Sequence, residues 1–356
     1  GAISAGCDFF GGYPIAPANE ISERMSQRLP QVGGKFVQGE DELCSIYACA
    51  GASLAGGKVM TATASAGYNY MQEGLGYCYA IEAPVVVADV QRCRGENYAS
   101  QADVYQMRYG ASGDYEAIVV CPSSVQELYD YTIWAFNLAE EYRNPVIIMS
   151  ETTIALMRER LDIPKAEDIS IFNRKYTTKS PEEYLPFAAP ENGCPEMAPL
   201  GEGYHTIYSL NPHDERGDIE WDPVVFDKLY KRVCGKITEN KDKICRTESY
   251  MMEDAQYAIV TYGSEVRPSM EAAQMAEEPA ARNSKLCNVW PVPEKAIHEV
   301  AGNVSKIFAV EMNMGKYVRE IERAASGKCQ VLPVTKNLGL VHTGLEILEE
   351  IKKGVK

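Results

Sequence analysis

The 356-residue sequence lacks the closely spaced ligands from which metal and iron–sulfur sites are usually built. Its eleven cysteines form no C-x-x-C pair, and its four histidines are scattered without metal-ligand spacing. We therefore expect no metal site in this chain, and we interpret the cysteines as buried, reduced thiols of a cytoplasmic protein. No apolar run is long enough to cross a bilayer, so we expect no membrane-spanning segment.

The common signatures of self-contained enzymes are also missing. The sequence has no G-x-x-x-x-G-K-[ST] phosphate loop, no G-x-G-x-x-G after a strand and no G-x-S-x-G nucleophile motif. Acidic residues outnumber basic ones by 50 to 35, which gives a net charge of −15. Nucleic acid and anionic membranes are poor candidates as partners, because binding them requires clustered Lys and Arg.

Short apolar runs alternate with amphipathic stretches along most of the chain. This alternation predicts an α/β fold with parallel sheets. The predicted strands cover 58–65, 83–91, 117–124, 145–151, 257–264, 285–293, 306–313 and 330–336, and the predicted helices of the first half cover 40–56, 68–81 and 123–142. A stretch rich in Pro, Gly, Asn and charge interrupts the pattern. We therefore predict a first domain over 1–164, an irregular connecting segment over 165–229 and a second α/β domain over 230–356.

Three acidic residues, Glu40, Asp41 and Glu42, open a helix that is otherwise apolar and small. Glu40 and Asp41 suit a helix N-terminus, where the helix dipole favours anions. Glu42 leads the apolar face, which would draw its carboxyl inward, raise its pKa and let it keep or share a proton near neutral pH. The periodicity alone also fits a simpler interpretation, in which all three acids lie in a solvated first turn.

Several longer motifs occur in an order that is similar to one known family. They are GYPIAPANEI, GEDELCSIYACAGASLAG, KVMTATASAGYNYMQEGLGY, PVVVADVQR, SQADVYQMRYG and PSSVQELYD, followed later by HDERG, YGSEVRPSMEA and FAVEMNMGKYVREI. Together they resemble the α subunit of the 2-oxoacid:ferredoxin oxidoreductases, and most of all its 2-oxoglutarate branch. The resemblance extends over nearly the whole chain.

The resemblance implies a thiamine-diphosphate enzyme whose active site is shared between subunits. The first domain would be the pyrimidine-binding domain, and the second would be similar to the C-terminal domain of transketolase. The chain lacks the G-D-G…N-N signature that holds Mg²⁺ and the cofactor diphosphate, and it lacks cluster cysteines. In the family these features lie on partners: a β subunit that holds the diphosphate, and γ and ferredoxin-like subunits. Coenzyme A would take the acyl group, and electrons would leave through iron–sulfur clusters to an external acceptor.

The resemblance assigns three residues to the cofactor. Glu42 matches the family glutamate that hydrogen-bonds the N1′ nitrogen of the aminopyrimidine, so a partly buried carboxyl with a raised pKa suits it. Pro14, in the YPITP-like segment, and Ser65 are expected to contact the same cofactor.

Five further residues are assigned to the substrate. Arg92 matches the family arginine that binds the substrate carboxylate, a natural role for a guanidinium. Tyr13 lies in the segment that lines the site, and Ala16 stands where the family has a threonine, so one hydrogen-bond donor is missing. Arg94 and Tyr98 replace small residues of the family motif and are expected to influence side-chain selection. An extra arginine favours 2-oxoglutarate, whereas the space at Ala16 suits a bulkier or aromatic 2-oxoacid.

The sequence leaves other functions open. The chain could be half of a thiamine-dependent decarboxylase or transketolase-like enzyme without electron transfer, or a non-catalytic subunit that only scaffolds a partner. The presence of Glu42 and Arg92 argues against the scaffold, and Ala16 argues weakly for it. The final electron acceptor, ferredoxin or NAD through another subunit, is also open.

Overall fold

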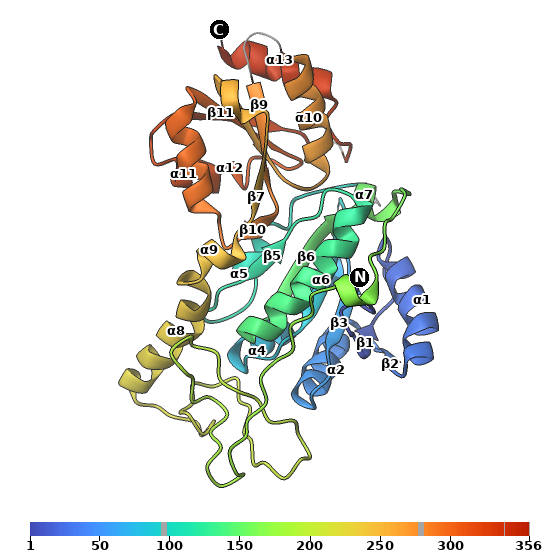
Figure 1. Cartoon of the computed structure of the whole chain (residues 1–356), viewed down its shortest axis with the longest axis vertical. Helices are drawn as coiled ribbons and strands as arrows, with labels where there is room; N and C mark the ends of the chain where they lie inside the picture. Colours follow the sequence, from blue (N-terminus) through green and yellow to red (C-terminus); the bar gives the residue numbers. More distant parts are fainter. Residues whose placement is uncertain (94–97, 277–280, 338, 356) are drawn as a thin grey trace.

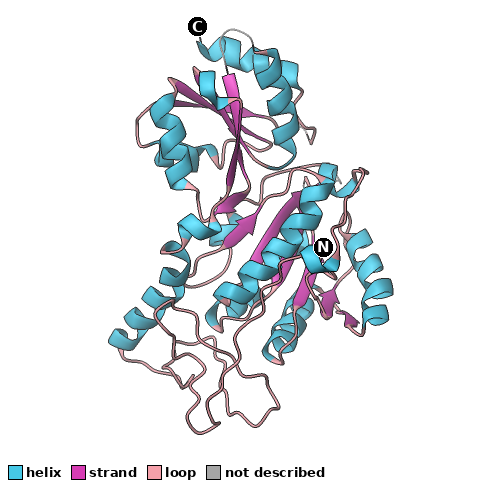
Figure 2. Ribbon diagram, in the orientation of Figure 1, coloured by secondary structure: helices cyan, strands magenta, loops and turns pink. Residues whose placement is uncertain are grey.

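Two sheets from different parts of the chain organise the molecule, with helices packed on them (Figures 1 and 2). The computed structural model describes residues 1–93, 98–276, 281–337 and 339–355. Within these residues the first sheet has the strand order β10-β5-β6-β4-β3-β1-β2, and the second has the order β12-β11-β8-β9-β7. Neighbouring strands run parallel except in the β10–β5 and β7–β9 pairs, which are antiparallel. The predicted α/β class with parallel sheets is confirmed.

The first sheet and its helices occupy the N-terminal half, apart from β10. The strands are β1 (Phe9–Gly12), β2 (Lys35–Gln38), β3 (Val59–Thr63), β4 (Val86–Gln91), β5 (Ile118–Val120), β6 (Val146–Glu151) and β10 (Asn288–Trp290). The helices are α1 (Asn19–Arg28), α2 (Glu42–Leu54), α3 (Ser65–Tyr70), α4 (Gln72–Ala80), α5 (Gln106–Tyr109), α6 (Val125–Tyr142) and α7 (Thr152–Leu156). The sequence predicts one helix over 68–81, but the structure breaks it at Met71 into α3 and α4.

The second sheet follows the irregular segment and two connecting helices, α8 (Pro223–Thr238) and α9 (Lys241–Ile244). Its strands are β7 (Thr247–Tyr250), β8 (Tyr257–Thr261), β9 (Ala281–Leu286), β11 (Lys306–Glu311) and β12 (Gln330–Thr335). Its helices are α10 (Val266–Met275), α11 (Glu294–Asn303), α12 (Val318–Ala325) and α13 (Gly344–Val355). None of the described helices combines the length and the apolar composition needed to cross a bilayer.

Strand alternation divides the core of the first sheet into two layers. On β4, Val87 packs into the cluster that includes α2 and α4, whereas Val86 and Ala88 pack into the cluster that includes α6. Because successive side chains of a strand point to opposite faces, a central strand that is buried on both faces reads as a continuous apolar run.

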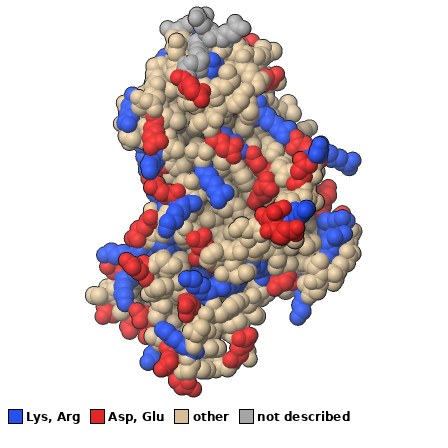
Figure 3. All heavy atoms as spheres, viewed as in Figure 1, with Lys and Arg blue, Asp and Glu red and all other residues tan. Residues whose placement is uncertain are grey.

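On the described part of the face in Figure 3, Lys and Arg side chains lie among Asp and Glu side chains.

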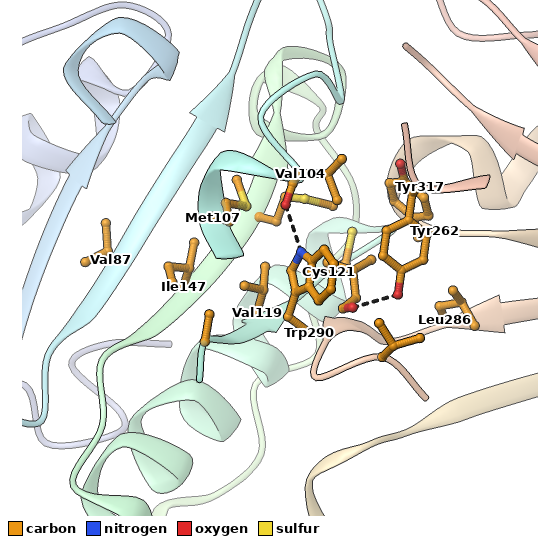
Figure 4. Packing of buried hydrophobic residues seen from close by; sticks show 14 of the residues in the cluster. Val87, Val104, Met107, Val119, Cys121, Ile147, Tyr262, Leu286, Trp290 and Tyr317 are labelled. Carbon is orange, nitrogen blue, oxygen red and sulfur yellow. Dashed lines mark hydrogen bonds between the residues drawn. The ribbon is translucent and has the colours of Figure 1, made fainter. Parts of the chain in front are cut away.

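The sequence prediction of one strand over 285–293 is wrong. The chain leaves β9 at Leu286 and then pairs with β5 of the first sheet as β10. The indole N–H of Trp290 donates to the carbonyl of Val104 at 2.8 Å, and its ring lies edge-on to Tyr317, at 5.6 Å between centroids (Figure 4). Burial of the Trp290 ring between the two sheets favours pairing of β10 with the first sheet over a longer β9 in the second sheet.

A buried ion cluster fixes α8 to the first sheet domain. Glu82 accepts from Arg232 at 2.7 and 2.9 Å and from Lys236 at 2.7 Å, and the Glu82 and Lys236 side chains are fully buried. Burial opposes ionisation of Glu82, but the two cations outweigh it and hold its pKa below the usual range. Removing one partner of such a cluster leaves an uncompensated buried charge.

We predict that Glu82→Ala lowers the free energy of unfolding by about 3–5 kcal/mol, because Lys236 loses its buried counter-ion. Asp227→Ala, on the α8 helix that the cluster attaches, is the control, since it removes the exposed Lys231–Asp227 pair. The control should cost about 0.5 kcal/mol or less. Urea unfolding of the purified protein measures both, and equal effects would contradict the structural importance of the cluster.

Candidate active site

The candidate residues gather at one edge of the first sheet. β1, β2, β3 and β4 run parallel, so their carboxyl ends meet at the same edge. Tyr13 and Ala16 follow β1, Ser65 follows β3 and Arg92 follows β4, while Glu42 lies four residues beyond β2. Ligands of open α/β sheets bind in the crevice at these ends.

Glu42 is the first residue of α2, and its side chain points inward. Asp41 caps the helix, accepting from the Cys44 amide at 2.7 Å. Glu42 is only 6% exposed, so it does not lie in a solvated first turn. Burial raises the pKa of the Glu42 carboxyl, and the neighbouring Asp41 raises it further. Within the described residues no side chain of another residue hydrogen-bonds this carboxyl.

The start of α3 packs directly on the Glu42 carboxyl. A Cβ atom placed on Gly67 would lie 2.2 Å from Oε1 of Glu42 and 2.2 Å from Oγ1 of Thr63. Real Cβ atoms do not approach other atoms so closely, so the contact requires glycine. It also brings the Thr63 hydroxyl close to the Glu42 carboxyl.

A cleft of about 630 Å³ opens at the same edge, between the two sheet domains. From the first domain Ser65, Arg92 and Asp103 line it, and from the second domain the loop 312–316 does, including Lys316. Glu42 is not among the lining residues. The segment 63–67 connects the two parts of the site, because it contacts Glu42 at one end and carries Ser65 into the cleft.

Ser65 and Arg92 are joined through the main chain. The amide of Arg92 donates to Oγ of Ser65 at 3.0 Å, and the Ser65 hydroxyl makes a short hydrogen bond to a carboxylate oxygen of Asp103. Tyr13 and Pro14 are exposed, and Ala16 is half-buried. The predicted cofactor and substrate roles of these residues remain predictions.

The remaining substrate candidates lie on the loop after Arg92. Tyr98 is exposed. A Cβ atom placed on Gly339 would lie 2.4 Å from the Cβ atom of Tyr98, so this loop contacts the second domain. Arg94 lies outside the described residues. The sequence interpretation did not single out Asp103 or Lys316, although both fall in quoted motifs, because only the fold brings them to Arg92.

Asp89 on β4 is a second acid that the sequence interpretation missed. Its side chain is fully buried, and among the described residues neither carboxylate oxygen has a hydrogen-bond partner. Burial raises its pKa well above the usual value, and the nearby Asp103 adds to the effect. It pairs across the sheet with Thr63, beneath the turn that contacts Glu42.

Comparisons with known proteins place this geometry in a family. Residues 1–231 match the thiamine-diphosphate-binding domain of the pyruvate flavodoxin/ferredoxin oxidoreductases, and residues 255–346 match core domain II of pyruvate:ferredoxin oxidoreductase. The chain belongs to this pyruvate flavodoxin/ferredoxin oxidoreductase family. The resemblance inferred from the motifs is thus confirmed.

Relatives within the oxidoreductase family match nearly the whole chain. The 2-oxoglutarate synthase subunit KorA of Methanothermobacter thermautotrophicus is 42% identical over 99% of this chain and 95% of its own length. The ketoisovalerate oxidoreductase subunit VorB of the same organism is 32% identical over 99% of this chain and 94% of its own length.

Two solved structures extend the comparison to the fold. The structure of 2-oxoglutarate:ferredoxin oxidoreductase from Magnetococcus marinus, with 2-oxoglutarate, coenzyme A and succinyl-CoA bound, matches all of this chain with a TM-score of 0.92 and 30% identity. This chain spans 63% of that chain's length. A split-gene transketolase with 14% identity and a TM-score of 0.56 shares the fold alone.

We predict that Asp89→Asn stabilises the protein at neutral pH. Because burial raises the pKa of Asp89, the fold accommodates its protonated form, and stability falls as the pH rises from about 4 toward that raised pKa. The variant should have a higher apparent Tm at pH 7.5, by about 2–4 °C per kcal/mol gained. The gain should shrink at pH 5. Asp168→Asn, at an exposed position, is the control and should leave the apparent Tm unchanged at both pH 7.5 and pH 5. If Asp89→Asn lowers the apparent Tm at pH 7.5, Asp89 is not neutral in the folded protein.

Proposed function

We propose that this chain is the α subunit of a heteromeric 2-oxoacid:ferredoxin oxidoreductase that converts 2-oxoglutarate and coenzyme A to succinyl-CoA and CO2. The observation that carries the proposal is the buried Glu42 carboxyl at the same sheet edge as Arg92. The higher identity to a 2-oxoglutarate synthase subunit than to a ketoisovalerate oxidoreductase subunit supports 2-oxoglutarate as the substrate. A bulkier 2-oxoacid remains the second candidate, because Ala16 leaves space at the site.

The residues at the sheet edge fit the pyrimidine half of thiamine diphosphate. Glu42 offers a carboxyl that is buried, that no other side chain among the described residues engages, and whose pKa burial raises. Such a group can hold a proton near neutral pH and hydrogen-bond a ring nitrogen such as N1′. Pro14 and Ser65 are the further candidates for contacts with this ring. When bound, thiamine diphosphate supplies the electron sink that decarboxylation of a 2-oxoacid requires.

Arg92 is proposed to bind the C1 carboxylate that every 2-oxoacid carries. A guanidinium pairs with a carboxylate through charge-assisted hydrogen bonds, which are roughly twice as strong as neutral ones. The threonine hydroxyl that Ala16 lacks would contribute only about 0.5–1.5 kcal/mol. Arg92 can therefore largely cover its loss. Tyr13 and Tyr98, both exposed beside this site, are proposed to contact the substrate, and Arg94 is proposed to select its side chain.

The remaining parts of the machinery are assigned to partner subunits. A β subunit would hold the cofactor diphosphate with Mg²⁺, and γ and ferredoxin-like subunits would carry the electrons through iron–sulfur clusters in the cytoplasm. Exposed tyrosines support coverage by a partner: Tyr70 donates to Asp41 at the start of α2 at 3.4 Å, and Tyr13, directly after β1, is 36% exposed. Aromatic residues of this kind are enriched in protein interfaces.

We predict that the isolated chain does not bind thiamine diphosphate with useful affinity, because it contributes only the pyrimidine half of the site. Calorimetric titration of the purified subunit with the cofactor and Mg²⁺ measures this directly. The same titration of the assembled complex is the control. Micromolar binding to the isolated chain would contradict a site shared between subunits.

We predict that Glu42→Gln lowers turnover of the assembled complex by about 100-fold or more, the lower range for loss of an acid–base group. The amide keeps the shape but cannot pass a proton, so cofactor occupancy should fall much less. Glu40→Gln is the matched control, because Glu40 is exposed two residues away. Steady-state turnover with bound-cofactor analysis measures both variants. Near wild-type turnover in Glu42→Gln would show that this acid has no catalytic role.

A further inference from the structure

We propose that Asp103 is a positioning residue of the substrate site, which orients Ser65 and through it the main chain at Arg92. The inference rests on the proposed function, because it assumes that Arg92 binds the substrate carboxylate. Asp103 lines the same cleft as Ser65 and Arg92.

The Ser65 hydroxyl lies between three groups that compete for it. Asp103 accepts a hydrogen bond from it, the Arg92 amide donates to it at 3.0 Å, and the Arg92 carbonyl lies 3.2 Å away. A serine hydroxyl has one proton and two lone pairs. The Asp103 carboxylate is the strongest acceptor and takes that proton. The Ser65 oxygen is thereby turned to receive the Arg92 N–H, rather than to donate to the Arg92 carbonyl.

Arg92 needs this support because it lies just beyond the sheet. β4 ends at Gln91, which pairs with Glu151 of β6, and Arg92 forms an isolated antiparallel bridge to Ala99. Its amide donates to the Ser65 hydroxyl at 3.0 Å, so this side chain helps to set the position of the main chain here. A main chain that shifts by a fraction of an ångström moves the guanidinium at the end of a long side chain, and such displacements weaken substrate positioning.

Contacts on both sides hold Asp103 itself in place. Its own amide donates to Oε1 of Gln91 at 2.9 Å, which ties it to the last residue of β4. The preceding carbonyl, that of Ala102, accepts from the Lys316 ammonium across the cleft. Asp103 is therefore fixed to the first sheet and to the second domain at once.

Gln101 extends this attachment to the second domain. Its amide donates to the Met312 carbonyl at 3.0 Å, and its Oε1 accepts from the Met312 amide at 2.8 Å. Its Nε2 donates to the Tyr262 carbonyl at 3.0 Å, and its side chain is buried. The loop after β11 thus sets the position of the segment that carries Asp103. Because Asp103 is fixed in this way, its carboxylate can orient the Ser65 hydroxyl, which would otherwise rotate freely.

The test uses the complete complex with saturating thiamine diphosphate, and compares Ser65→Ala, Asp103→Ala and Asp103→Asn. Loss of a hydrogen bond that involves a charged group corresponds to about a tenfold change. We therefore expect KM for 2-oxoglutarate to rise about tenfold in Ser65→Ala and Asp103→Ala, with kcat changed by less than about threefold. Asp103→Asn keeps an acceptor oxygen and should rescue most of the KM.

Ser53→Ala is the matched control. Ser53 is a buried serine that donates to the Pro84 carbonyl at 2.7 Å, just before the other end of β4. Its removal should lower the apparent Tm of the complex but leave KM unchanged. Hydrogen exchange gives a readout independent of turnover: the peptide that contains the Arg92 amide should exchange faster in Ser65→Ala and not in Ser53→Ala.

Two results would overturn the proposal. One is unchanged exchange at Arg92 in both Ser65→Ala and Asp103→Ala. The other is a weaker cofactor affinity in Ser65→Ala with an unchanged KM, which would make Ser65 a cofactor contact alone. Arg92→Ala separates this failure from failure of the proposed function. If the wild-type complex turns over 2-oxoglutarate and Arg92→Ala does not raise KM, the assignment of Arg92 is wrong, and the positioning role falls with it.

Discussion

The pairing of β10 with β5 is the contact on which the arrangement of the two domains depends. It takes a strand from the C-terminal half and adds it to the N-terminal sheet, and Trp290 then becomes buried between them (Figure 4). One hydrophobic cluster consequently runs from Val87 on β4 to Tyr317 beside the second sheet. The cleft at the sheet edge depends on this strand pairing, because its second wall, including Lys316, comes from the C-terminal half.

Buried acids of two kinds occur within this frame. Glu82 is paired with two cations and stays ionised, so it contributes to the attachment of α8. Among the described residues, no cation pairs with Glu42 or Asp89, and burial raises the pKa of both. Desolvation makes a buried carboxylate without a counter-ion costly for stability. By raising the pKa of Glu42, the same desolvation lets this carboxyl exchange a proton near neutral pH.

Much of the fold could be predicted from local patterns. β3, β4, β6, β8 and β11 are apolar runs in the sequence, and α6 lies within the helix that the sequence predicts over 123–142. β2 and β7 could not be found, because they are short and largely exposed and so carry no apolar signal.

The candidate site was predictable only in part. Motif similarity pointed to Glu42 and Arg92, whereas Asp103 and Lys316 reach the cleft through contacts between residues more than 200 positions apart, such as Ala102 with Lys316. No spacing rule encodes such a contact. The burial of Asp89 is likewise invisible in the sequence, because an acid in an apolar run does not reveal which groups will face it.

Gly67 has a consequence for sequence variation. It has no functional group, yet any Cβ at this position would displace the carboxyl of Glu42 and the hydroxyl of Thr63 together. Even the smallest replacement, alanine, therefore shifts the Glu42 carboxyl although residue 42 itself is unchanged. Sequence changes at position 67 are therefore restricted by the space that the Glu42 carboxyl and the Thr63 hydroxyl occupy.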